Sequence, residues 1–255
     1  MKYSIQDVLS DEKVRKEIIT KLTQILIYLK FDSVLAKKYA EIAVTVSKEQ
    51  GAAYAERYLH NEFEKLGLTK VILDSFKGRA ELIYSQVKPY VYGTDVLDLG
   101  SGDGKVGELI ANDGKNVMLV DVLDFNQTSL PFTTFNGVDL PYGDKSFDTT
   151  ILLTVLHHAD EPLKVLQEAK RVTRGKIIVL ESVYFDEDHR KVNTFFDWFW
   201  NRVLHQGINA PFNFNSPTGW EEVFKENGLT VEHSIDLGVD QPTVPEHHWL
   251  YVLKV

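Results

Sequence analysis

The sequence predicts an α/β protein with a doubly wound, mostly parallel sheet of seven strands, preceded by a helical N-terminal extension. Three observations predict it. After about residue 90, short apolar, β-branched runs alternate with helical patterns, as in parallel sheets covered by helices on both faces. One of these runs ends in a glycine-rich turn that leads straight into a helix, and the next run ends in an acid. Before residue 90, the periodicity is helical only.

Residues 1–90 are expected to form a helical extension or cap. Apolar residues recur there every three or four positions, which is typical of helices with one buried face. Two roles remain open for these helices: packing or contact within a homodimer, and a cap over the ligand site in which Arg79 reaches a carboxylate. The predicted helices cover residues 14–29, 32–47, 51–66 and 73–87.

Residues 91–255 are expected to form the sheet domain, because strand-like and helical patterns alternate through them. The predicted strands cover residues 95–99, 116–121, 132–136, 149–154, 176–180, 230–237 and 248–255. The predicted helices cover residues 105–112, 161–172, 187–204 and 220–227.

Composition and charge narrow the function classes. The chain has no cysteine, which excludes disulfides, thiolate metal sites and cysteine nucleophiles. The net charge of −9 is concentrated after residue 90, so we expect no nucleic-acid partner for that part. The mildly basic first part leaves an RNA-docking role open as an alternative. The most apolar early stretch, residues 22–31, is too short to span a bilayer, and we expect a cytoplasmic protein.

The stretch VLDLGSGDG, residues 96–104, indicates a ligand loop at the end of the first strand. Glycines at positions 100, 102 and 104 permit positive φ and close approach of the backbone to a ligand. The helix that follows offers free N–H groups at its N-terminus. A dinucleotide-binding loop would have its third glycine one residue later, where Lys105 stands, so NAD is the weaker interpretation. A glycine-rich turn without a ligand is the structural alternative.

Asp121 ends the second strand, about twenty residues after the glycine loop. In a doubly wound sheet, an acid in this position faces the ribose of a bound nucleoside and accepts hydrogen bonds from its hydroxyls. The alternative is an ordinary turn residue. We predict the ribose role.

These residues resemble the successive signatures of class I S-adenosylmethionine (SAM)-dependent methyltransferases. The resemblance rests on DLGSGDG at 98–104, on Asp121 and on LPYGDKSFD at 140–148, and it covers about residues 75–185. The last segment is similar to that of the group that includes the ubiquinone and menaquinone methyltransferases. Residues 155–158 (VLHH), 162–163 and 168–172 continue the likeness. The loop at residues 172–176 is shorter than is usual in this family.

The resemblance implies a Rossmann-like methyltransferase fold, SAM as cofactor and S-adenosylhomocysteine as product. It implies that the glycine loop holds the methionine part of SAM, that the ends of the second and third strands meet the ribose and adenine, and that the end of the fourth strand approaches the sulfonium. Asn136 stands where the family usually has an acid. The implied cofactor residues are Asp98, Gly100, Ser101, Gly102, Gly104, Asp121, Val122, Asn136, Gly137, Thr154 and Val155.

Candidates for catalysis come from position, because methyl transfer needs a general base only where the acceptor must lose a proton. We expect polar side chains after the fourth and fifth strands and in the turn before the last strand to lie at the ligand edge of the sheet. Each has an ordinary structural alternative. The candidates are His157, His158, Glu181, Tyr184 and His247. No cluster has the spacing of a strong metal site, and we predict none.

The helix after the fifth strand is unusually aromatic, with Phe195, Phe196, Trp198, Phe199 and Trp200. One interpretation is core packing. The other is a lid at residues 187–219 that lines the pocket of a bulky apolar or aromatic small-molecule acceptor and leaves aromatic faces exposed. Beyond small-molecule methylation, an RNA or protein methyltransferase and a non-catalytic SAM-binding protein remain alternatives.

Overall fold

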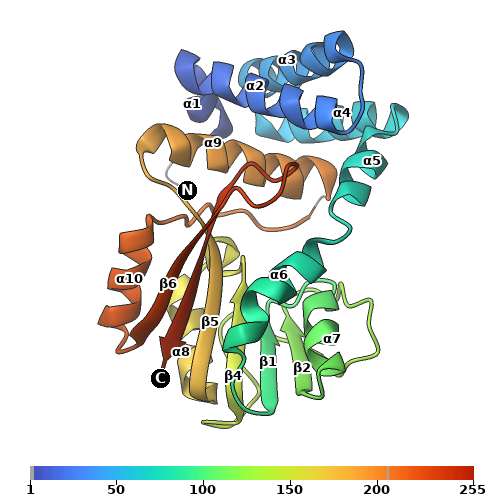
Figure 1. Ribbon diagram of the computed structural model, residues 1–255. Helices are drawn as coiled ribbons and strands as arrows, with labels where there is room; N and C mark the ends of the chain where they lie inside the picture. Colours follow the sequence, from blue (N-terminus) through green and yellow to red (C-terminus); the bar gives the residue numbers. More distant parts are fainter. Residues whose placement is uncertain (1–2, 206) are drawn as a thin grey trace. The chain divides into compact units, whose positions relative to one another are not determined.

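The computed structural model describes residues 3–205 and 207–255, and it separates the chain into two compact units (Figure 1). The sheet unit comprises residues 78–182, 215–238 and 248–255. The helical unit comprises the described part of residues 1–77 together with 183–214 and 239–247. The division falls after residue 77, whereas the sequence suggested about residue 90. The reason is that α6 (Arg79–Val87) contributes Ile83 and Val87 to the core of the sheet unit.

The sheet has seven strands in the order β3-β2-β1-β4-β5-β7-β6, which confirms the predicted doubly wound architecture. Neighbouring strands from β3 to β5 pair in parallel, and β6 runs antiparallel to β7. The chain builds outward from β1 in both directions, so the carboxyl ends of β1 and β4 flank a switch point where ligands bind in such sheets. The strands are β1 Asp95–Leu99, β2 Asn116–Asp121, β3 Phe132–Thr134, β4 Phe147–Leu153, β5 Thr173–Val183, β6 Thr230–Gly238 and β7 His247–Lys254.

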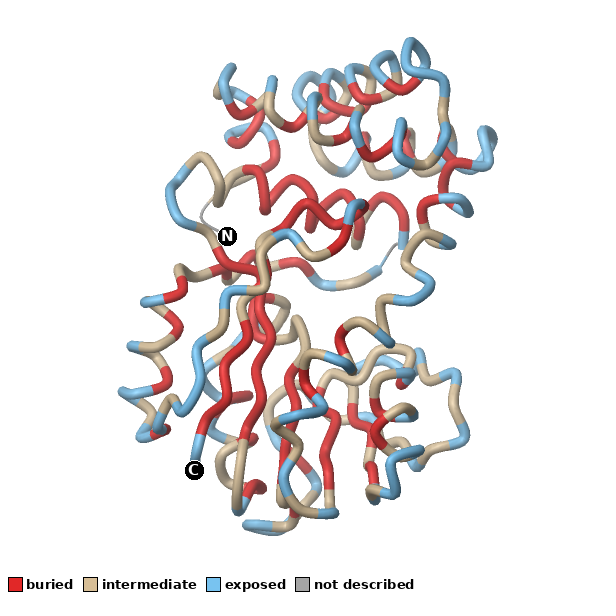
Figure 2. Tube along the Cα trace, viewed as in Figure 1, coloured by how far each residue is buried: buried red, intermediate tan, exposed pale blue. Residues whose placement is uncertain are grey.

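Helices cover both faces of this sheet (Figure 1). On one face, α6 packs beside α7 (Lys105–Asn112). On the other face lie α8 (Pro162–Val172) and α10 (Pro217–Glu226), and Lys170 of α8 donates to the carbonyl oxygen of Asn227 just after α10. The central strands β1, β4 and β5 are largely buried, whereas the edge strand β6 is exposed (Figure 2), as expected for a parallel sheet covered by helices.

The helical unit holds five N-terminal helices and the segment that follows β5. The helix expected over residues 73–87 is interrupted, because Gly78 adopts a left-handed conformation with φ of 88° and the chain turns there. The helices are α1 Ile5–Ser10, α2 Glu12–Tyr28, α3 Ser33–Gln50, α4 Ala52–Lys65, α5 Leu68–Ser75, α9 Glu187–Trp198 and the π-helix η3 Phe199–Leu204. Across the described residues, none of the helices is both long and apolar enough to cross a bilayer.

The aromatic segment forms the core of the helical unit. The five rings predicted there are at most 6% exposed, and α9 is largely buried in Figure 2. Phe199 meets Phe63 of α4 edge to face at 5.6 Å, and the Trp198 indole N–H donates to Glu56 at 2.9 Å. The expectation of exposed aromatic faces is therefore wrong. Helices packed around α9 within this unit bury more than one of its faces, which a pattern within α9 alone does not reveal.

Candidate functional site

The loop after β1 takes the conformation that its glycines predict. Gly100, Gly102 and Gly104 have φ angles of 78°, 54° and 76°, in the region that side chains other than glycine rarely adopt. The N–H groups of Gly100 and Ser101 donate to the carbonyl oxygen of Val120 at 2.7 and 3.1 Å. These bonds fold the loop back over the end of β2.

Two of these glycines are needed for different reasons. A Cβ atom on Gly100 would lie 2.5 Å from Cγ2 of Val155, so the absence of a side chain lets β1 and the turn after β4 meet. A Cβ atom on Gly102 would have no protein atom within 4 Å. None of the described residues therefore fills the space beside Gly102, as expected for a glycine that faces a ligand.

Asp121 lies where the sequence placed it, at the end of β2, and it shapes the loop. One carboxylate oxygen accepts from the Gly102 N–H at 2.8 Å, and the other accepts from the Val122 N–H at 2.7 Å. The oxygen that accepts from Val122 also accepts from the Leu123 N–H at 3.3 Å. Since a carboxylate has about four acceptor positions, these three bonds leave room for a further donor such as a ribose hydroxyl. Val122 follows and is 52% exposed, so it offers an apolar surface beside Asp121.

The Ser101 hydroxyl offers a direct test of whether the loop fits a ligand. Its oxygen is buried and has no hydrogen-bond partner within the described protein, and a buried polar atom without a partner is unfavourable. The unpartnered hydroxyl, the open space beside Gly102 and the remaining acceptor capacity of Asp121 together fit SAM. That molecule offers hydroxyl and amino donors together with a carboxylate acceptor.

Asp98 is buried directly beneath the loop, with 2% of its surface exposed. Burial, and then the nearby charge of Asp121, raises the pKa of Asp98 to about 7. A hydrogen bond from the Gly107 backbone opposes that rise. A Cβ atom on Gly107 would lie 3.0 Å from the Asp98 carboxylate and 2.6 Å from Leu119. Sequence reasoning missed Gly107; the available signal was a glycine inside an otherwise regular helix.

The Asn136 side chain after β3, which was expected to contact adenine, is bonded within its own turn. The Asn136 side-chain oxygen accepts from the N–H groups of Val138 and Asp139, and its amide group donates to Asp139. The side chain thus closes its own turn and is exposed. Gly137 has φ of 84°, and a Cβ atom there would lie 3.5 Å from Val122. The adenine contact expected of Asn136 and Gly137 stays a prediction, and the Asn136 side chain is already bonded within its own turn.

β4 stops at Leu153 because Thr154 adopts a left-handed φ of 59°, a strained conformation for a β-branched residue. The Thr154 N–H donates to Leu180 of β5 at 2.7 Å. The Thr154 hydroxyl donates to the Leu153 carbonyl oxygen at 2.6 Å. This turn carries Val155 to the glycine loop.

Three of the five catalytic candidates come together in the sheet unit. Glu181, near the end of β5, is fully buried and accepts from the N–H groups of Val155 and Leu156 at 3.0 and 2.7 Å. Its second oxygen is hydrogen-bonded to Nδ1 of His157. The His157 and His158 rings lie 4.2 Å apart. Glu181 thus contacts protein groups with both oxygens, which does not suit a general base.

The other two candidates belong to the helical unit. The Arg190 guanidinium lies 5.2 Å from the centre of the Tyr184 ring, and Tyr184 packs at the edge of the aromatic core. His247 meets Phe185 edge to face at 4.8 Å.

The LPYGDKSFD segment is mainly a scaffold. Arg171 of α8 forms a bidentate ion pair with Glu168 and also donates to the carbonyl oxygens of Leu140 and Tyr142. Asp148 accepts from Arg174 at 2.6 Å and from the backbone N–H groups of Thr94 and Asp95 at the start of β1. Arg174, and then those N–H groups, hold the pKa of Asp148 far below its usual value. The motif therefore ties β4 to β1 and α8.

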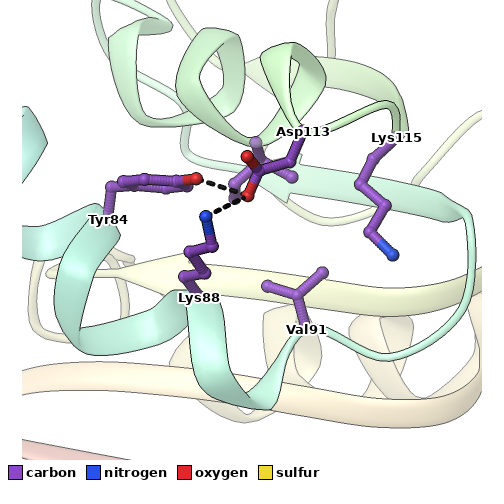
Figure 3. Close-up of a pocket in the computed structure, with 6 residues that line it drawn as sticks. Tyr84, Lys88, Val91, Asp113 and Lys115 are labelled. Carbon is purple, nitrogen blue, oxygen red and sulfur yellow. Dashed lines mark hydrogen bonds and ion pairs between the residues drawn. The ribbon is translucent and has the colours of Figure 1, made fainter.

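A surface pocket of about 390 Å³ lies at the opposite edge of the sheet, near the starts of β1 and β2 (Figure 3). Asp113 accepts there from Tyr84 and pairs with Lys88 at 2.8 Å. Lys115 turns to the Gly93 carbonyl oxygen. These charges satisfy one another, and none of the predicted site residues lines this pocket.

The domain that carries this loop is similar to known methyltransferase domains. A family model described as a methyltransferase domain matches residues 97–179. A demethylmenaquinone methyltransferase of Renibacterium salmoninarum is 33% identical over 100 residues, which is 36% of this chain and 42% of that protein. A ubiquinone biosynthesis O-methyltransferase of Rickettsia bellii is 24% identical over 142 residues, which is 50% of this chain and 59% of that protein. The matches thus span less than two thirds of these relatives.

Solved structures agree on the fold. A SAM-dependent methyltransferase of Methanosarcina mazei superposes with a TM-score of 0.52 at 16% identity, covering 66% of this chain and 95% of that one. One from Mesorhizobium loti superposes with a TM-score of 0.53 at 14% identity, covering 71% and 100%.

Proposed function

We propose that this chain, which carries a class I SAM-dependent methyltransferase domain, transfers a methyl group from SAM to a small-molecule acceptor. The observation that carries the proposal is the glycine loop closed by Asp121. Three features lie together at the switch point of the sheet: open space beside Gly102, a Ser101 hydroxyl without a hydrogen-bond partner among the described residues, and the Asp121 carboxylate with acceptor capacity left. The strand order of the sheet is the doubly wound order that the methyltransferase resemblance implied.

The cofactor, when bound, supplies an electrophilic methyl group on a sulfonium, and S-adenosylhomocysteine leaves once an acceptor oxygen, nitrogen or carbon has taken that methyl. The chain itself binds the cofactor, aligns the acceptor with the methyl group and excludes water. The glycine loop and Asp121 hold the nucleoside and methionine parts. The turn after β4, with Val155 against Gly100, forms the wall that faces the reacting end.

The acceptor we propose is a bulky, apolar or aromatic small molecule. The menaquinone and ubiquinone enzymes among the relatives support this class. The chain's net charge of −9 disfavours an RNA acceptor. The fold alone leaves the reaction open, since a [4+2]-cyclase superposes with a TM-score of 0.52.

The proposal is tested first by titration calorimetry with S-adenosylhomocysteine, SAM and NAD. We expect one site per chain for the first two ligands and no measurable NAD binding. Asp121→Ala should weaken S-adenosylhomocysteine binding by about 1–3 kcal/mol, since it removes hydrogen bonds to a charged group. NAD binding more tightly than S-adenosylhomocysteine would refute the cofactor assignment.

The acceptor is tested by following S-adenosylhomocysteine release with a panel of alkylated phenols and hydroquinones beside total RNA and a protein substrate mixture. Turnover with at least one phenolic compound, and none with the macromolecules, is expected. Turnover on RNA that falls steeply with added salt would point to the RNA alternative.

A further inference from the structure

We propose that Glu181 is a positioning residue that fixes both the cofactor loop and the ring of His157. The inference rests on the proposed function for its consequence and on the geometry of the sheet unit for its mechanism. Glu181 lies within the buried part of β5 and has no exposed surface. Its side chain reaches across to the turn after β4, not toward solvent.

On the cofactor side, Glu181 acts through Val155. One carboxylate oxygen accepts from the consecutive N–H groups of Val155 and Leu156. These groups have no strand partner there, because the left-handed Thr154 has taken the chain out of the β4 ladder. The Val155 side chain packs directly on Gly100, whose Cβ position lies 2.5 Å from Cγ2 of Val155. The carboxylate therefore sets how closely this turn approaches the first glycine of the loop.

On the acceptor side, Glu181 acts through His157. The second carboxylate oxygen is hydrogen-bonded to Nδ1 of the buried ring. Because the carboxyl group already accepts two backbone N–H groups, an acceptor role toward Nδ1 as well keeps the proton on Nδ1 and fixes the orientation of the ring. The ring thus has one tautomer and one direction, and it lies tilted by 41° against the ring of His158. This arrangement assigns Glu181 a role in orientation, in place of the base or substrate anchor that its position in the sequence suggested.

Replacing the carboxylate with an amide separates the two effects. In Glu181→Gln, the remaining carbonyl oxygen still accepts from the Val155 and Leu156 N–H groups. The new NH₂ group faces Nδ1 of His157, which must then accept and carry its proton on Nε2. In Glu181→Ala, both effects are lost, and two buried N–H groups lose their acceptor.

The experiment is ¹⁵N NMR of histidine-labelled protein, with His157→Gln used to identify the ring signals. We expect the proton on Nδ1 in the wild type and on Nε2 in Glu181→Gln. Glu232→Gln, which removes a surface partner of Lys176 at the other end of β5, is the matched control and should leave the ring unchanged. A wild-type proton on Nε2, or a proton that stays on Nδ1 in Glu181→Gln, would overturn the acceptor-side role.

S-adenosylhomocysteine affinity supplies the second readout. Glu181→Gln should stay within about threefold of the wild type, and Glu181→Ala should bind at least tenfold more weakly. Unchanged affinity in a folded Glu181→Ala would overturn the cofactor-side role. If Glu181→Ala fails to fold, a more than tenfold loss of affinity in Glu181→Gln, which keeps the acceptor oxygen, overturns that role. If the wild type binds no S-adenosylhomocysteine, the proposed function fails while the NMR result still decides the role of Glu181.

Discussion

Gly102→Ala is the sharpest perturbation of the candidate cofactor site, because the structure separates its effect on folding from its effect on ligand binding. Gly102 has φ of 54°, and its Cβ position is open to more than 4 Å. Alanine there meets no protein atom, so the cost to folding is the left-handed backbone alone, about 1–2 kcal/mol. For a protein of this size, each kcal/mol of lost stability lowers Tm by roughly 2–4 °C.

Gly114→Ala is the matched control. Gly114 follows α7, has φ of 82° and also has no atom within 4 Å of its Cβ position. It lies before β2, at the edge of the sheet away from the glycine loop. The same backbone penalty therefore applies without any change near the cofactor.

The assay pairs thermal melting with calorimetric titration of S-adenosylhomocysteine. Both variants should melt a few degrees below the wild type. Only Gly102→Ala should lose affinity, by about 1–3 kcal/mol, the usual cost of forcing a methyl group into occupied space; this is about 5- to 150-fold. Equal S-adenosylhomocysteine affinity in the two folded variants would show that the space beside Gly102 is not the cofactor site.

Two further predictions concern buried side chains. Burial raises the pKa of Asp98 to about 7, so the folded state keeps a proton that the unfolded chain releases near pH 4, and stability is lost as pH rises toward 7. Asp98→Asn should gain about 3 kcal/mol over the wild type between pH 5 and pH 8 in urea unfolding; a constant difference would contradict the buried-acid account. Phe199→Ala should cost about 3–5 kcal/mol of unfolding free energy, because its ring is fully buried. Tyr28→Ala, at a ring that is 54% exposed, should cost much less, and equal losses would argue against the aromatic core.

The sequence alone determined the sheet and the cofactor loop. Gly100, Gly102 and Gly104 all adopt positive φ, and Asp121 closes the loop from the next strand. These features can be predicted because they depend on short chain segments. A glycine permits backbone conformations that other residues rarely adopt, and the periodicity of apolar residues indicates strands and helices. The ligand roles of these residues, and of the catalytic candidates, stay predictions.

Tertiary structure decided what depends on partners far apart in the chain. The sequence suggested Glu181 as a base or a substrate anchor, and only the pairing of β4 with β5 shows that both of its oxygens contact residues 155–157. The sequence left core packing and a lid open for the aromatic segment, and burial follows from the tertiary structure, because α9 is enclosed within a unit that gathers residues from three parts of the chain. Burial and hydrogen bonding are properties of the neighbours that folding brings together, and periodicity within one segment does not specify them.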